Sequence, residues 1–66
     1  MTISINGEPR QIQRAQNVAE LIEEIALPAS AILVEHNGQA LRREEWPARL
    51  LAEGDRIELV RIVAGG

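Results

Sequence analysis

The sequence has no cysteine, no lysine, no tyrosine and no phenylalanine, and it contains a single histidine, His36. Without cysteine the chain cannot form a disulfide, hold an iron–sulfur cluster or build a thiolate zinc site. One histidine excludes a multi-histidine metal site, and its place beside a predicted turn favours a structural or solvent-facing role. Neither serine, Ser4 or Ser30, has a recognisable activating base nearby in sequence. We therefore expect no metal site, and we predict that the protein alone is not an enzyme.

Basic residues are few, and they are not clustered. The net charge is −3, and the seven basic residues are all arginines. The only adjacent pair, Arg42-Arg43, is followed at once by Glu44-Glu45, which we interpret as solvated carboxylates. Nucleic-acid binding requires a basic surface, so no nucleic-acid partner is expected. The absence of lysine also means that the protein offers no lysine side chain as an acceptor for chain building.

Long hydrophobic runs are absent as well. No apolar segment approaches membrane-spanning length and no charged-then-apolar leader opens the chain, so we expect a cytoplasmic protein without membrane contact. With 66 residues, of which 45% are hydrophobic and 26% charged, the composition is globular. A chain of this length buries only about 60% of its unfolded surface. We predict one domain over residues 1–66, monomeric when free, with a tail at 62–66.

The N-terminal segment predicts a hairpin. Residues 2–6 alternate with period two, as a half-buried strand does. Asn6-Gly7 is a strong turn signal, because both central residues of a type I′ turn need a positive φ. We expect Glu8-Pro9 to lengthen the connection, and residues 10–13 to return as a polar edge strand.

A helix is predicted to begin at Asn17. Its side chain can accept from the first free N–H groups, and Glu20 stands at the capping-box position. An apolar stripe with helical spacing follows, formed by Val18, Leu21, Ile22 and Ile25. We expect Pro28 to end this helix, since a proline disfavours helical geometry in the residue before it.

The second half of the chain predicts three more extended segments, at 31–35, briefly at 39–41, and from 56 to about 63. Between them, residues 43–49 are expected to form a loop with a short helical turn, with Leu50 and Leu51 tucked beneath it. Trp46 is expected to anchor the thin core, with its indole N–H bonded to a partner at the edge. The order predicted is ββαββ with a C-terminal tail, an α+β fold in which one mixed sheet packs on one helix.

The sequence ends in Gly65-Gly66, directly after a β-branched apolar run. Glycine has no Cβ, so this tail can enter a channel too narrow for any side chain. A terminal carboxylate has a pKa near 3.5 and is ionised at neutral pH, where it can act as a nucleophile. We predict that another protein activates Gly66. Chance, an expression remnant or a trimmed precursor would also leave this ending.

The strand before the tail predicts a docking surface. Ile57 and Leu59 share a parity and are expected to face the helix, whereas Glu58, Val60 and Ile62 face outward. Exposed β-branched apolar residues just before the tail favour a partner-docking patch. The alternative is a bulge that shifts the parity and buries Val60.

Three short motifs carry a family resemblance: Arg43-Glu44-x-Trp46, Leu51-x-x-Gly54-Asp55-x-Ile57, and the terminal Ala64-Gly65-Gly66. With the length and the element order, they resemble the ThiS-type sulfur carriers of thiazole (thiamine) biosynthesis. The resemblance covers essentially the whole chain. Members often have a third glycine where this chain has Ala64, which loosens the match. The terminal pair alone is shared with the wider ubiquitin-like superfamily, including the MoaD-related small subunit of molybdopterin synthase.

The resemblance implies a β-grasp fold and a defined cycle. The carboxylate of Gly66 would attack the α-phosphate of ATP in a ThiF-type adenylating enzyme. Sulfur from a cysteine desulfurase system or a related persulfide donor would then displace AMP, leaving a thiocarboxylate that thiazole synthase (ThiG-type) uses. ATP and Mg²⁺ would belong to the partner, and this chain would bind no cofactor. The docking residues would be Val60, Ile62, Val63, Ala64 and Gly65.

Two other interpretations remain open at this point. One is a molybdopterin-synthase-type sulfur carrier, which uses the same chemistry with a different acceptor. The other is a ubiquitin-like protein modifier or a plain binding module. A binding module should keep its function without Gly65 and Gly66, whereas both carrier interpretations require them.

Overall fold

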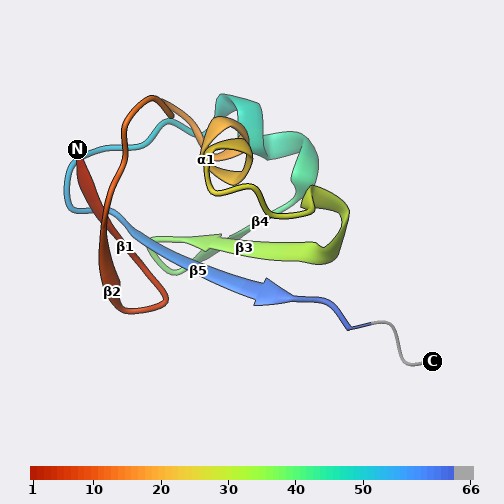
Figure 1. Ribbon diagram of the computed structural model, residues 1–66. Helices are drawn as coiled ribbons and strands as arrows, with labels where there is room; N and C mark the ends of the chain where they lie inside the picture. The colour runs from red at the N-terminus through yellow and green to blue at the C-terminus, as the bar shows by residue number, and fades with distance from the viewer. Residues whose placement is uncertain (64–66) are drawn as a thin grey trace.

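The computed structural model describes residues 1–63, which form five strands and one α-helix (Figure 1). In chain order the elements are β1 (Thr2–Ile5), β2 (Glu8–Gln11), α1 (Val18–Glu24), the 3-10 helix η1 (Ala29–Ala31), β3 (Ile32–His36), β4 (Gln39–Leu41), the 3-10 helix η2 (Arg43–Ala48) and β5 (Arg56–Arg61). The strands form one sheet in the order β2-β1-β5-β3-β4. Only the β1–β5 pair is parallel, so the sheet is mixed as predicted. The short β4 makes the order ββαβββ.

The β1–β2 hairpin turns within two residues. Asn6 and Gly7 have φ of 51° and 83°, the left-handed geometry of a type I′ turn. The return strand therefore begins at once, at Glu8, and not at residue 10 as predicted from the sequence. Pro9 pairs with Ser4 inside β2. Proline is tolerated there because β2 is an edge strand, and on its open side there is no neighbouring strand to which an N–H would donate.

The helix begins where the sequence predicts. Asn17 is the N-cap, and its side-chain oxygen accepts a 2.8 Å hydrogen bond from the Glu20 N–H. The Glu20 carboxylate accepts from the N–H of Gln16 at 2.8 Å, one residue before the cap. Glu24, one helical turn later, accepts from the three N–H groups of residues 13–15 at 2.8–2.9 Å. The two carboxylates thus hold the incoming loop against α1.

The helix ends earlier than predicted, at Glu24 and not at Pro28. Ala26 has a φ of 59° and donates to the Glu23 carbonyl, while the Leu27 N–H donates to the Ile22 carbonyl at 3.3 Å. This pair of bonds is a Schellman motif, which terminates a helix by placing one residue in the left-handed region. The residue in that position is usually glycine, and alanine gives no such signal in sequence.

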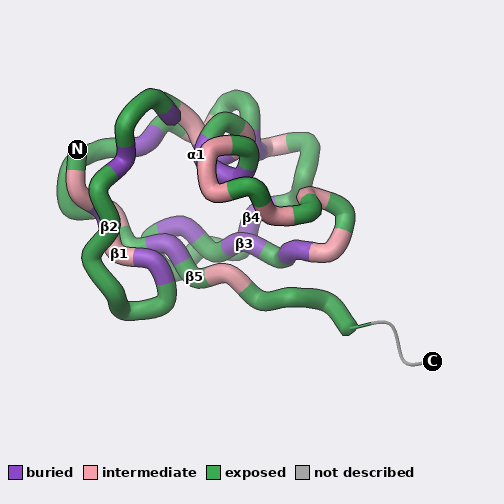
Figure 2. Tube along the Cα trace, viewed as in Figure 1, coloured by how far each residue is buried: buried purple, intermediate pink, exposed green. Residues whose placement is uncertain are grey.

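The core lies between α1 and the sheet (Figure 2). Its buried apolar residues are Ile3, Ile5, Ile12, Ala15, Val18, Leu21, Ile22, Ile32, Val34, Leu41, Trp46, Leu51 and Ile57. Trp46 anchors this core as predicted, at 4% exposed, and no group within residues 1–63 hydrogen-bonds to its indole nitrogen, so the partner expected at the edge is not found among them. Leu51 is buried as expected, whereas Leu50 is 70% exposed because its backbone bridges to Asn17 and its side chain faces solvent.

Candidate functional site

The central strand β5 leads to the C-terminal tail, and its side chains alternate between core and solvent. Ile57 is fully buried and Leu59 packs against the core, whereas Val60 is 57% and Ile62 47% exposed. The register of β5 against β3 is continuous over β5 residues 57–61. The alternative of a bulge that buries Val60 is therefore excluded. The docking role of these outward residues remains a prediction.

A third apolar residue joins this outward surface. Leu33 on β3 pairs directly with Val60 and is 56% exposed. We call Leu33, Val60 and Ile62 together the outer patch. Sequence reasoning missed Leu33, because residues 31–34 are a continuous apolar run that shows no alternation. The alternation was nevertheless readable, since Glu35 has the same parity as Leu33 and a glutamate marks the solvent side of a strand.

Acidic residues border the outer patch on the side away from the tail. Glu35 on β3 lies opposite Glu58 on β5, and both are exposed. Like charges in directly opposed positions of an antiparallel pair repel each other. The outward face thus changes from acidic to apolar as β5 runs towards the tail.

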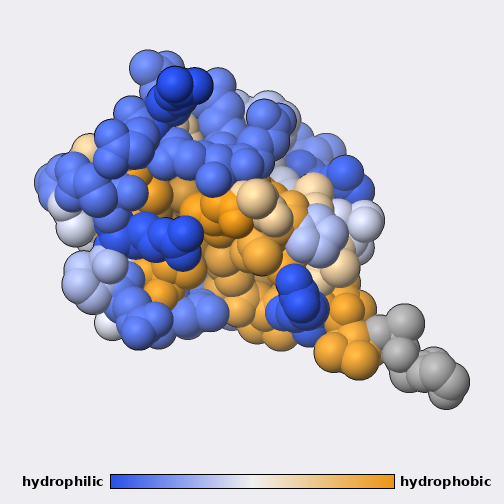
Figure 3. Space-filling model, in the orientation of Figure 1, coloured by the Kyte–Doolittle hydropathy of each residue, from blue (hydrophilic) through white to orange (hydrophobic). Residues whose placement is uncertain are grey.

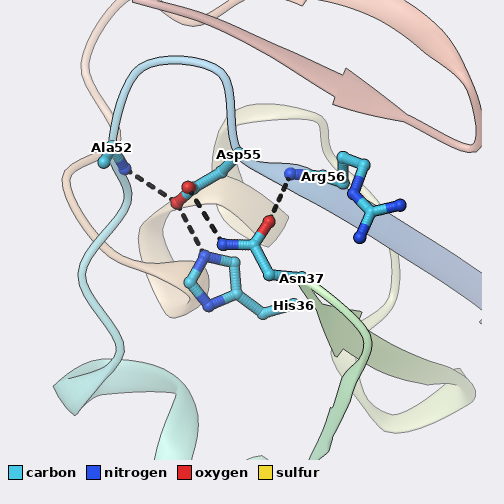
Figure 4. A network of polar contacts seen from close by, with 5 residues as sticks. All are labelled: His36, Asn37, Ala52, Asp55 and Arg56. Carbon is cyan, nitrogen blue, oxygen red and sulfur yellow. Dashed lines mark hydrogen bonds and ion pairs between the residues drawn. The ribbon is translucent and has the colours of Figure 1, made fainter.

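A polar network fixes the other end of β5 (Figure 4). The Asp55 carboxylate accepts from the Ala52 N–H at 2.8 Å and from the Asn37 side chain at 3.1 Å, and it lies 2.6 Å from Nε2 of His36. Asn37 in turn accepts from the Arg56 N–H at 2.8 Å. These contacts join the β3–β4 turn to the turn before β5, so His36 has the structural role predicted from its position. At 7% exposed, it is buried rather than facing solvent.

The network also sets the ionisation of Asp55. Partial burial raises the pKa of this carboxyl, but hydrogen bonds from His36, Asn37 and the Ala52 N–H outweigh it and hold the pKa below its ordinary value. The carboxylate is therefore charged at neutral pH and serves as the acceptor at the centre of the network.

The tail itself lies only partly within the described residues. Val63 is 81% exposed and is the last of them. The predicted site residues Ala64, Gly65 and Gly66 lie outside the described residues, so their roles remain predictions.

The described part of the chain shows neither a metal-binding cluster nor a membrane-spanning helix. Within residues 1–63 no three His, Asp or Glu side chains are grouped so as to hold a metal ion. The same residues contain no helix with the length and apolar character required to cross a membrane.

A mixed five-stranded sheet with one α-helix across its inner face and a central last strand defines a ubiquitin-like β-grasp fold. A crystal structure of the thiamine biosynthesis protein ThiS from Geobacter metallireducens matches it over the full length of both chains, with a TM-score of 0.85 and 33% sequence identity. The model of the ThiS family matches residues 3–66. The chain belongs to the ThiS family.

Two sulfur carrier proteins are similar to this chain over nearly their whole length. The sulfur carrier protein ThiS of Escherichia coli is 32% identical over 66 residues, covering all of both chains. The sulfur carrier protein ThiS of Thermus thermophilus is 34% identical and covers 94% of this chain and 95% of its own. A thiazole synthase from Paramagnetospirillum magneticum is 27% identical over the whole of this chain, which spans 20% of that protein.

Proposed function

We propose that this protein is a sulfur carrier of thiamine biosynthesis and that Gly66 carries the sulfur as a C-terminal thiocarboxylate. The observation that carries the proposal is the family match, which extends to Gly66 and therefore includes both terminal glycines. The fold supports it, because the central strand of the sheet leads into the tail and the outer patch lies beside that strand.

The proposed cycle begins with activation of the terminal carboxylate. An oxygen of Gly66 attacks the α-phosphorus of ATP in a ThiF-type enzyme, and pyrophosphate leaves. A persulfide sulfur from a cysteine desulfurase system then attacks the carbonyl carbon and displaces AMP. A thiol reduces the resulting acyl disulfide and frees the thiocarboxylate. ATP and Mg²⁺ are held by the activating partner in this scheme.

Thiazole synthase is the proposed acceptor of the sulfur. The thiazole synthase from Paramagnetospirillum magneticum is similar to this whole chain over one fifth of its own length. A carrier-like segment within the same chain as a thiazole synthase supports a functional interaction between the carrier and the synthase. The five residues from 62 to 66 span at most about 18 Å when extended. The folded body can therefore bind a partner through its outer patch while Gly66 reaches into that partner's active site.

Intact-protein mass spectrometry tests this function directly. The chain is incubated with a ThiF-type enzyme, ATP, Mg²⁺ and a persulfide source, and its mass is measured before any acid or reductant is added. We expect a species heavier by one oxygen-to-sulfur exchange, localised to Gly66. Addition of thiazole synthase with its other substrates should return the carboxylate. Persistence of the unmodified mass would contradict the proposal, and charging without discharge to the synthase would favour a molybdopterin-type acceptor.

A further inference from the structure

The two edges of β5 are occupied to different extents. The Ile62 N–H donates to the Ala31 carbonyl at 2.7 Å, and the Asn37 N–H donates to the Arg56 carbonyl at 2.8 Å. The backbone N–H and C=O groups of the even-numbered residues of β5 therefore point towards β3. Because successive residues of a strand direct their backbone groups to opposite edges, those of Ile57, Leu59 and Arg61 face the β1 side.

Strand β1 covers only the first part of that side. It pairs with β5 no further than Ile5 opposite Ile57. The side chain of Asn6 then takes the place of a strand, accepting from the Leu59 N–H at 2.7 Å and donating to the Leu59 carbonyl at 3.2 Å. Beyond this point Arg61 lies opposite Ile32 in the β3–β5 register, but its own N–H and C=O face the β1 side, where no group within residues 1–63 hydrogen-bonds to them. One donor and one acceptor are left on an open edge, which is a template for another strand.

A groove of about 640 Å³ lies beside this open edge. Its apolar lining comes from the sheet and from the segment after α1, and includes Ile5, Ile25, Leu27, Ile32 and Leu59. On the face of the molecule drawn in Figure 3, apolar surface is exposed in the middle, with hydrophilic residues above it. A side chain of a strand added at Arg61 would have this groove beneath it.

The rim of the groove is positively charged on balance. Arg10 and Arg61 line it together with one acid, Glu8. Within residues 1–63 neither arginine forms an ion pair. An extended segment with a carboxylate beside its apolar side chain would complement both the rim and the groove.

We propose that the open edge of β5 at Arg61 receives an extended, acidic and apolar segment of thiazole synthase as an added strand. The segment hydrogen-bonds to the Arg61 backbone, places an apolar side chain in the groove and sets a carboxylate against Arg10 or Arg61. This is strand addition, in which backbone pairing supplies affinity and the alternate side chains supply specificity. The proposal rests on the proposed function for its choice of partner, and it adds an edge contact to the contact through the outer patch.

Proline substitution separates the backbone donor from the side chain. Arg61→Pro removes an N–H that the fold does not use, and proline is tolerated where that N–H faces an open edge. Arg61→Ala is the matched control, since it removes the charge and keeps the N–H. We expect Arg61→Pro to bind thiazole synthase about fivefold more weakly than Arg61→Ala, the effect of losing one backbone hydrogen bond. Equal affinity of the two folded variants would overturn the proposal.

Amide hydrogen exchange of the unmodified chain gives a test that needs no substitution. In the free protein the Arg61 amide should exchange quickly, and saturating thiazole synthase should slow it at least about tenfold. Arg10→Glu should weaken synthase binding, whereas Arg43→Glu, an equal charge change on η2, should not. An Arg61 amide that stays unprotected in the saturated complex with thiazole synthase would overturn the proposal. Protection by the ThiF-type enzyme but not by thiazole synthase would overturn it as well. The same samples are converted to the thiocarboxylate, and their intact masses are measured. A failure of sulfur transfer is thereby recorded separately from a failure of the edge contact.

Discussion

Leu33 on β3 lies directly opposite Val60 on β5, and both side chains are more than half exposed on the outer face of the sheet. A cross-strand pair of this kind normally stabilises a sheet by packing against further residues. Here the pair is exposed to solvent beside Ile62. Contiguous exposed apolar side chains are typical of a surface that contacts another protein.

Charge placed in this pair should weaken partner binding without unfolding the protein. We expect Leu33→Asp, and the double change Val60→Asp with Ile62→Asp, each to lower affinity for the adenylating enzyme or thiazole synthase at least about tenfold, because an apolar contact is replaced by a desolvated carboxylate. Titration calorimetry measures the affinity, and thermal unfolding verifies the fold. Leu50→Asp is the control, since Leu50 is even more exposed, at 70%, but its backbone bridges to Asn17 at the start of the helix. Unchanged affinity of the double variant would remove the outer patch from the interface.

The alanine that terminates α1 predicts a stabilising substitution. Ala26 holds a φ of 59° and is exposed, so its Cβ strains the backbone and contributes no packing. Ala26→Gly should raise the free energy of unfolding by about 0.5–1 kcal/mol, because glycine adopts this geometry without the clash. Urea denaturation measures the change. Ala48→Gly, in the exposed 3-10 helix η2, should act in the opposite direction by loosening an ordinary backbone position. A loss of stability in Ala26→Gly would show that the left-handed geometry is not strained.

The lowered pKa of Asp55 predicts how stability depends on pH. Its folded-state pKa lies below the ordinary value of 3.8, so the unfolded chain takes up the proton first as the pH falls. The stabilisation from this carboxylate is complete above about pH 4 and is lost as the pH falls through the folded-state pKa. Asp55→Asn should therefore flatten the acid limb of a stability–pH curve measured by urea denaturation.

At neutral pH the same substitution should destabilise the fold by about 1 kcal/mol, because an amide offers one acceptor oxygen where the carboxylate offers two to His36, Asn37 and the Ala52 N–H. The acid limb of Glu24→Gln is compared with that of Asp55→Asn. Three backbone N–H groups lower the pKa of Glu24, so this carboxylate also contributes to the loss of stability in acid. An acid limb of Asp55→Asn identical to that of the unsubstituted chain would assign the pH dependence to other groups.

Local signals in the sequence were enough to predict much of the fold. The Asn17 cap, the Asn6-Gly7 turn and the outward side of β5 each depend on a few neighbouring residues, and each is confirmed. The helix end is different, because alanine in the left-handed region is held there by the Schellman bonds and not by its own preference. No periodicity reveals that.

The candidate site was predictable to a similar degree. Val60 and Ile62 followed from strand parity, but Leu33 reaches the same surface only through the pairing of β3 with β5. His36 and Asp55 are 19 residues apart, and their contact also depends on that pairing. Sequence spacing indicates which side of a strand a residue faces, whereas the neighbour across the sheet comes from the topology.

The last prediction concerns the tail, whose terminal glycines lie outside the described residues. One alanine appended after Gly66 moves the carboxylate outward by about 3.5 Å and attaches a side chain beside it, so the adenylating enzyme should no longer activate the chain. Gly65→Val should fail as well, because a branched side chain cannot enter a channel shaped for glycine. Pyrophosphate release measures activation, and the urea midpoint should be unchanged in both variants, since all the core residues lie within residues 1–63 and neither change alters one of them. Efficient adenylation of the extended form would mean that the carboxylate is not held at a fixed depth, and the sulfur-carrier proposal would then lose its requirement for Gly66 as the last residue.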